Sequence, residues 1–133
     1  MENQEKFDQW LQVFKLWCPF LDIKVAAFFA AQSALETGWF KSDVYHQCNN
    51  LFGMRMPKSR ITLAEGSKLN HAFYNVVYDS FVDYLLWLTA FGFNQSDLKD
   101  FSRFVAKFSK SPYNSSNKYV ATILEIYNIY YHE

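Results

Sequence analysis

Residues 30–39 of the chain read AAQSALETGW and end a long apolar stretch in which Glu36 is the sole acidic residue. Apolar residues occupy most sides of a helix drawn from about residue 22 to residue 37, which is typical of a central, buried helix. Gly38 is suited to end it, because glycine readily adopts the left-handed conformation that closes helices. The sequence therefore predicts a core helix with an acidic group at its C-terminal end.

Glu36 is the first candidate for a catalytic group. The ten residues before it are uncharged, so we expect desolvation to favour its protonated form. The negative end of the helix dipole acts in the same direction. A carboxyl that stays protonated near neutral pH is what a general acid requires. The alternative is a glutamate that simply points to solvent at a helix end.

The rest of the chain predicts further helices and one hairpin, within a single domain that spans residues 1–133. Residues 60–64 and 69–77 have strand character, and we expect them to pair across a turn at residues 65–68. Ser80 and Asp83 resemble a capping box at the start of a helix. The other predicted helices lie at about residues 4–17, 96–109 and 116–131. The predicted fold class is α+β, mainly helical, with five or six helices and a short hairpin lobe.

Composition excludes several classes of protein. Half of the 133 residues are hydrophobic and 20% are aromatic, unlike a disordered chain. Thirteen basic and thirteen acidic residues cancel, so no long-range attraction draws the chain to nucleic acid or an anionic membrane, and neither is expected as a partner. No apolar run reaches the roughly 18 residues of a membrane span. Cys18 and Cys48 are too few for a disulfide framework, and we expect no metal site and no cofactor.

Four blocks of the sequence resemble, in the same order, motifs of the glucosaminidase domains of glycoside hydrolase family 73. The first is residues 30–39, and the second is CNNLFGMR at residues 48–55. The third runs from Phe73-Tyr74 to Asp83-Tyr84, and the fourth is Tyr113 followed six residues later by Tyr119. Together they cover about residues 25–125. Phe40 departs from the pattern, because the family commonly has a glycine there.

The resemblance implies a lysozyme-like fold, with a helical lobe and a short β-hairpin lobe flanking a cleft. It implies that the chain binds peptidoglycan glycan strands and cleaves the β-1,4 bond after N-acetylglucosamine. Glu36 falls on the family's catalytic general acid. Glu65 is the sole acidic residue between Asp43 and Asp79, and it is the candidate for a second catalytic carboxylate. The substrate's own N-acetyl group is the other candidate for that step.

Five residues are predicted for the substrate site. Trp39, Tyr74 and Tyr113 fall on motif positions of the family, and their flat rings suit the C–H faces of sugar rings. Asn50 and Phe52 belong to the loop that we expect to pass Glu36, with Asn50 holding that loop. Next to them, Gly53 is predicted to allow a backbone angle or a close approach that a side chain would block.

Two other functions are compatible with the same sequence. The same fold could support a muramidase, which cuts the other glycosidic bond, or a lysozyme-like binding or structural module without turnover. The polar, acidic start of the chain lacks the pattern of a signal peptide. A bare catalytic module of this size suits a phage lysis or virion protein, or a domain delivered by another route, and we expect a monomer.

Overall fold

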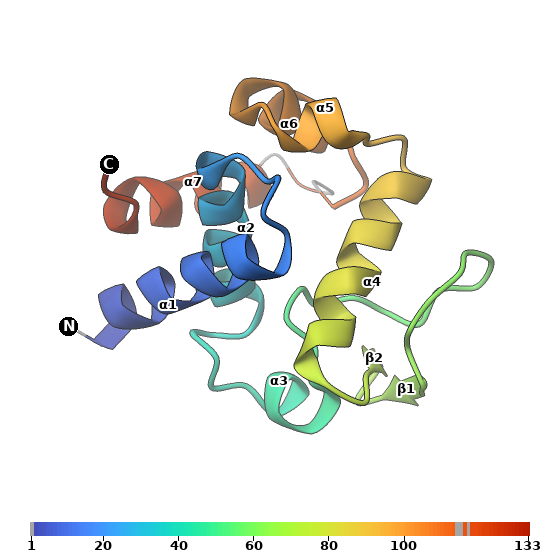
Figure 1. Ribbon diagram of the computed structural model, residues 1–133. Helices are drawn as coiled ribbons and strands as arrows, with labels where there is room; N and C mark the ends of the chain where they lie inside the picture. Colours follow the sequence, from blue (N-terminus) through green and yellow to red (C-terminus); the bar gives the residue numbers. More distant parts are fainter. Residues whose placement is uncertain (1, 114–115, 117) are drawn as a thin grey trace. The chain divides into compact units, whose positions relative to one another are not determined.

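The computed structural model describes residues 2–113, 116 and 118–133 (Figure 1). These residues form seven helices and one two-stranded antiparallel sheet. This mainly helical α+β pattern, of the lysozyme-like kind, confirms the predicted fold class. The chain divides into two compact units. The first contains the residues up to Gln32 together with Phe93–Glu133, and the second is Ser33–Gly92.

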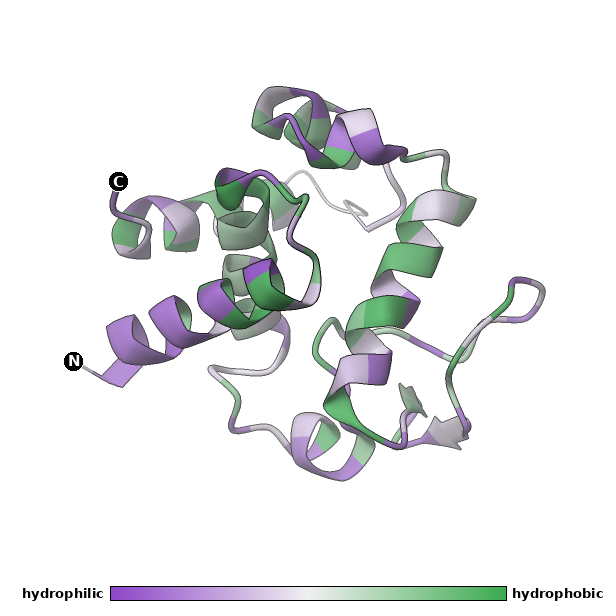
Figure 2. Ribbon diagram, viewed as in Figure 1, coloured by the Kyte–Doolittle hydropathy of each residue, from purple (hydrophilic) through white to green (hydrophobic). Residues whose placement is uncertain are grey.

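The first unit is organised around aromatic side chains. It contains α1 (Glu2–Trp17), the start of α2 (Ile23–Glu36), α5 (Gln95–Leu98), α6 (Phe101–Phe108) and α7 (Tyr119–Tyr130). One face of α1 is buried at Phe7, Leu11 and Phe14, the spacing of an amphipathic helix. Phe28 of α2 packs edge-on against Phe104 (5.2 Å between ring centroids) and Phe108 (5.1 Å) of α6. Figure 2 shows hydrophilic and hydrophobic residues alternating along α1.

Two helices replace the single one predicted at residues 96–109. Asn94 and Asp97 form a capping box at the start of α5, and Asp100 caps α6 by accepting a hydrogen bond from the Arg103 N–H. The prediction of one continuous helix was wrong because Asp100 adopts an extended conformation as the cap of α6, which ends the helix before it.

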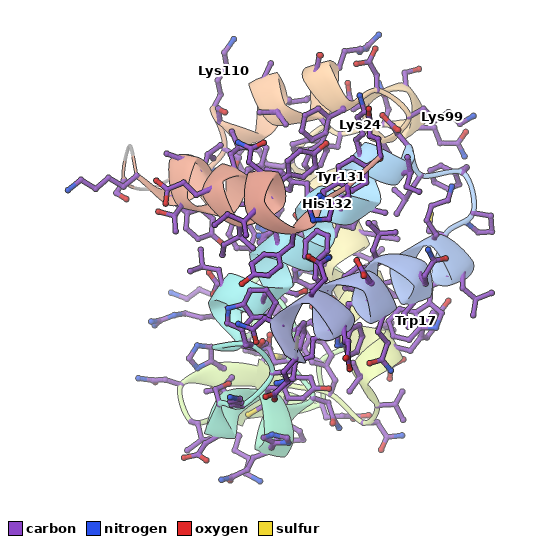
Figure 3. All side chains as sticks on the ribbon, turned by 90° about the vertical axis from the view of Figure 1, so that its left-hand side faces the viewer. Trp17, Lys24, Lys99, Lys110, Tyr131 and His132 are labelled. Carbon is purple, nitrogen blue, oxygen red and sulfur yellow. The ribbon has the colours of Figure 1, made fainter. Side chains whose placement is uncertain are left out.

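The C-terminal residues are tied to the start of α2. Lys24 Nζ lies 3.0 Å from Glu133 Oε1. The pKa of Tyr131 is raised, mainly by burial, and the positive charge of Lys24 partly opposes this effect. Figure 3 labels Lys24, Tyr131 and His132 close together on one face of this unit. The adjacent Tyr127 is partly buried, and this burial, with the negative charges around it, raises its pKa to about 12.

The second unit contains α3 (Asp43–Cys48), β1 (Gly66–Lys68), β2 (His71–Phe73) and α4 (Val77–Ala90). The short helix α3 was not predicted, although Ser42 caps it and Asn49 ends it in the left-handed conformation. The capping box predicted at Ser80 was wrong. Helix α4 begins at Val77, so Ser80 lies inside it, where its hydroxyl donates to the Val77 carbonyl and accepts from the Leu51 N–H.

The hairpin turn lies at Leu69-Asn70, and not at residues 65–68 as predicted. Both turn residues have positive φ, 53° and 62°, as a two-residue turn of type I′ requires. Leucine is unfavourable in that conformation, so the sequence does not signal it. Gly66, which looked like a turn residue, instead pairs with Phe73. The Phe73 ring packs against Gly66, and a Cβ there would lie 3.0 Å from ring atom Cε1.

Among the described residues, no helix has both the length and the apolar character that crossing a membrane would require.

Candidate active site

Glu36 is the last residue of α2, a helix whose one other charged residue is Lys24. Ser33 and Ala34 just before it are fully buried, and Glu36 itself is half-buried. Its carboxyl group therefore lies where an apolar helix reaches partial solvent exposure, at the end of the helix where the dipole is negative. A group in this position can meet a substrate while its own helix remains anchored in the core.

The turn after Glu36 contains three residues with positive φ in succession. Gly38, Trp39 and Phe40 have φ values of 56°, 58° and 65°. Thr37 stabilises the turn, since its hydroxyl donates to the Ser33 carbonyl (2.7 Å) and accepts from the Phe40 N–H (2.8 Å). Trp39 and Phe40 therefore have a left-handed backbone conformation, which costs a residue other than glycine roughly 1–3 kcal/mol.

Phe40 stands where the family pattern commonly has glycine, and its positive φ explains why glycine suits that position. The phenyl ring is buried and packs edge-on against Tyr45, with 5.7 Å between ring centroids. Burying a phenylalanine side chain contributes roughly 1.5–3 kcal/mol, which offsets the backbone strain.

Gly53 brings the backbone of its loop directly against Glu36. Its φ is +67°, and a Cβ at this position would overlap Oε2 of Glu36 and lie 3.0 Å from Cδ. Both predicted reasons for a glycine here, the backbone angle and the close approach, are confirmed. A side chain at residue 53 would therefore force the Glu36 carboxylate to move from its present position.

Asn50 holds the loop that carries Gly53. Its side-chain amide donates to the carbonyls of Met54 (2.9 Å) and Ala72 (2.8 Å). Its carbonyl oxygen accepts from the N–H groups of Phe52 (3.3 Å) and Met54 (3.2 Å). Asn50 is 1% exposed, so its side chain closes the loop and fastens it to β2. Contact between Asn50 and a substrate stays a prediction.

The aromatic residues predicted for this part of the site differ in exposure. Phe52 is fully buried and stacks on Tyr84 of α4, with ring centroids 4.0 Å apart. Tyr74 is 2% exposed, and its hydroxyl donates to Asp83 (2.6 Å). Trp39 is half-buried. Direct contact with a sugar stays a prediction for all three, and packing around the loop is the role visible for Phe52.

Asp83 forms a buried network that the sequence did not reveal. Arg60 donates to both carboxylate oxygens, at 2.8 and 3.1 Å, and Thr62 and Tyr74 donate through their hydroxyls. Burial raises the pKa of the Asp83 carboxyl, but these hydrogen bonds and the Arg60 charge outweigh that effect and lower the pKa below its usual value. The available signal was an acidic residue within the apolar stretch of residues 81–88.

Glu65 lies at the base of the hairpin, in the same unit as Glu36. It comes directly before β1, its side chain is exposed, and its backbone N–H donates to the Phe73 carbonyl at 2.8 Å. The backbone of Glu65 is thus held by pairing with β2, at the end of the hairpin opposite to the turn. A catalytic role for Glu65 stays a prediction.

Tyr113 belongs to the first unit. It is half-buried and stacks between Phe108 (5.6 Å between centroids) and Tyr119 (6.1 Å). The Tyr119 hydroxyl accepts a hydrogen bond from Gln32 at 3.3 Å. The two tyrosines of the fourth motif are therefore stacked on each other, and sugar binding by Tyr113 stays a prediction.

Comparison with protein families gives one match over most of the chain. Residues 21–132 match the family model named Glucosaminidase, described as mannosyl-glycoprotein endo-beta-N-acetylglucosaminidase. The chain belongs to the glucosaminidase family. Comparisons with curated proteins and with solved structures give no match. Membership of this family assigns the chain to the glycoside hydrolases.

The titratable groups of this glucosaminidase domain do not gather into a metal-binding cluster within the described residues. No group of three or more His, Cys, Asp and Glu side chains there is arranged to hold a metal ion. The two cysteines, Cys18 and Cys48, are buried free thiols whose pKa values are raised by burial.

Replacing Gly53 by alanine tests the close approach to Glu36. The new methyl group must displace the carboxylate, and a displacement of about 1 Å at a reacting group can cost about 10²-fold in rate. We expect Gly53→Ala to lower hydrolysis of purified peptidoglycan by that order. Gly92→Ala is the matched control, because Gly92 also has positive φ (+93°) but a Cβ there meets nothing within 4 Å. Equal losses in the two variants would contradict the interpretation.

The Asp83 network predicts a loss of stability in acid. Because the folded-state pKa of Asp83 is below its unfolded value, its contribution is present at pH above about 4 and disappears as pH falls through the folded value. Denaturant unfolding at pH 7, 4 and 3 measures it. We expect Asp83→Asn to lower the free energy of unfolding by about 3–5 kcal/mol at pH 7, since Arg60 loses its partner. The decrease of this free energy between pH 4 and pH 3 should also be smaller in the variant.

Asp79→Asn is the control for that experiment, because it removes a carboxylate from the same helix, α4. It should cost much less stability at pH 7 than Asp83→Asn does, because it leaves Arg60 with its partner. A decrease between pH 4 and pH 3 that is as large in Asp83→Asn as in the parent chain would show that another group is responsible.

Proposed function

We propose that this chain is a peptidoglycan hydrolase, an endo-β-N-acetylglucosaminidase that cleaves the β-1,4 bond after N-acetylglucosamine. The observation that carries the proposal is the contact between Glu36 and Gly53, within a chain that matches the glucosaminidase family over residues 21–132. The Glu36 carboxyl is half-buried, so part of it is open to solvent, and Gly53 lets it lie against the backbone of the loop. Net charge zero suits a long, largely neutral glycan.

In this proposal Glu36 is the general acid. It donates its proton to the oxygen of the leaving sugar as the glycosidic bond breaks. The ten residues before Glu36 carry no charge, and Glu36 lies at the negative end of the dipole of α2, a position in which a helix disfavours a carboxylate. Trp39 and Tyr113, each within its own unit, are proposed to contact sugars, and Asn50 and Phe52 to support the loop that carries Gly53. Tyr74 is 2% exposed and bonded to Asp83, so its proposed role is to hold the Asp83 network.

Glu65 is proposed as the second catalytic group, the base that activates water. An inverting glycosidase places the two carboxyl groups roughly 6.5–9.5 Å apart, with the water between them. The ordered backbone at the base of the hairpin supports this assignment, because a base must be presented at a defined position. The competing mechanism uses the substrate's N-acetyl group as the nucleophile and retains the anomeric configuration.

Glu36→Gln keeps the shape of the side chain and removes the transferable proton. We expect the variant to fold normally and to hydrolyse purified peptidoglycan at least about 10²-fold more slowly. Asp43→Asn, an exposed carboxylate at the start of α3, is the control and should retain activity. Full turnover by Glu36→Gln would exclude Glu36 as the acid.

Mass spectrometry of the fragments distinguishes the alternatives in the same experiment. Fragments with a reduced N-acetylglucosamine end indicate a glucosaminidase, and a reduced muramic acid end indicates a muramidase. Absence of fragments from the parent chain would mean a binding module.

The anomer formed first tests the role of Glu65. We expect NMR to show inversion, and Glu65→Gln to slow hydrolysis by about 10²-fold or more, as loss of a general base does. A retained anomer together with a near-normal rate in Glu65→Gln would instead support the N-acetyl mechanism.

A further inference from the structure

The Asp83 carboxylate contacts the chain on both sides of the hairpin. On the side that enters β1, Oδ1 accepts from Arg60, from the Thr62 hydroxyl (2.8 Å) and from the Leu63 N–H (3.2 Å). On the side that leaves β2, Oδ2 accepts from the Tyr74 hydroxyl at 2.6 Å. Asp83 is 0% exposed and lies in α4, so one buried charge fastens both ends of the hairpin to a helix.

Thr62 extends this network to the residue beside Glu65. Its hydroxyl donates to Asp83 and also accepts from the Ala64 N–H at 3.0 Å. The next backbone N–H, that of Glu65, donates to the Phe73 carbonyl. The N–H groups of residues 63, 64 and 65 are thus each bonded, to Asp83, Thr62 and Phe73 in turn, although Leu63 and Ala64 belong to no strand.

Stability alone is a weak reason for such an arrangement. A buried ion pair adds little compared with apolar side chains of similar volume, and its better-supported use is to specify a single geometry. Here the residues that receive a defined geometry are those that lead directly to Glu65.

We propose that Asp83 and Thr62 are positioning residues, which fix the base of the hairpin and thereby orient the Glu65 carboxylate for hydrolysis. This inference rests on the proposed function and assigns to the network a role in that reaction. Neither side chain needs to touch the substrate, because both act through the backbone of residues 63–65.

Thr62 offers the sharper test, since it can be changed without leaving a buried charge unpaired. Thr62→Val preserves the shape and removes both hydrogen bonds, whereas Thr62→Ser keeps the hydroxyl. On soluble peptidoglycan glycan chains we expect Thr62→Val to lower kcat at least about tenfold, with KM within about twofold, because the base is misplaced. Thr62→Ser should restore kcat to within about twofold of the parent chain, and circular dichroism checks that each variant folds.

The same substitution in a Glu65→Gln background separates positioning from general damage. If Thr62 acts through Glu65, Thr62→Val should lower kcat by less than about twofold there, because the group that it positions is already absent. An equal loss in both backgrounds, an unchanged kcat in Thr62→Val, or parent-like activity of Glu65→Gln would each overturn the inference. Activity in Glu36→Gln would overturn the proposed function itself, so the two failures are distinguishable.

Discussion

The packing of the Glu36 carboxylate against the backbone of Gly53 is the constraint on which the second unit depends. For the two to meet, the loop at residues 49–54 must be held at a fixed depth. Asn50 does this by bonding to both the loop and β2. The backbone adds two more bonds, from the Ala72 N–H to the Met54 carbonyl and from the Tyr74 N–H to the Cys48 carbonyl. Beneath the loop, Phe52 stacks on Tyr84 of α4.

The second unit contains features that oppose stability close to its proposed catalytic groups. Trp39 and Phe40 adopt positive φ just after Glu36, and the charged Asp83 is fully buried at the base of the hairpin. Each is compensated locally, by the burial of Phe40 and by the donors around Asp83. Strain of this kind persists when the surroundings determine the conformation more strongly than the residue does, and it is common at functional sites. In the second unit, strained backbone thus follows Glu36 directly, and a buried hydrogen-bonded network holds the segment that precedes Glu65.

The first unit has a different character. Its core consists of phenylalanine rings in edge-on and stacked contact, contributed by α1, α2 and α6. Aromatic contacts of this kind are dense and favour one arrangement of the helices. The stacked tyrosines of the fourth motif join this core through Phe108. This core buries Phe28 and Phe29 of α2 completely.

The sequence by itself determined the elements whose signals are local. The apolar pattern predicted α2 to within one residue at each end, and the motif at residues 48–55 indicated a glycine in close approach to Glu36. The tertiary structure decided the turn at Leu69-Asn70, the burial of Asp83 and the position of Glu65. Strand pairing places leucine in a conformation that it does not favour alone. The environment of a carboxylate likewise depends on which distant donors reach it, and Arg60 is 23 residues from Asp83 in the chain. Such long-range pairings leave no periodic trace in the sequence, because they exist only once the chain has folded.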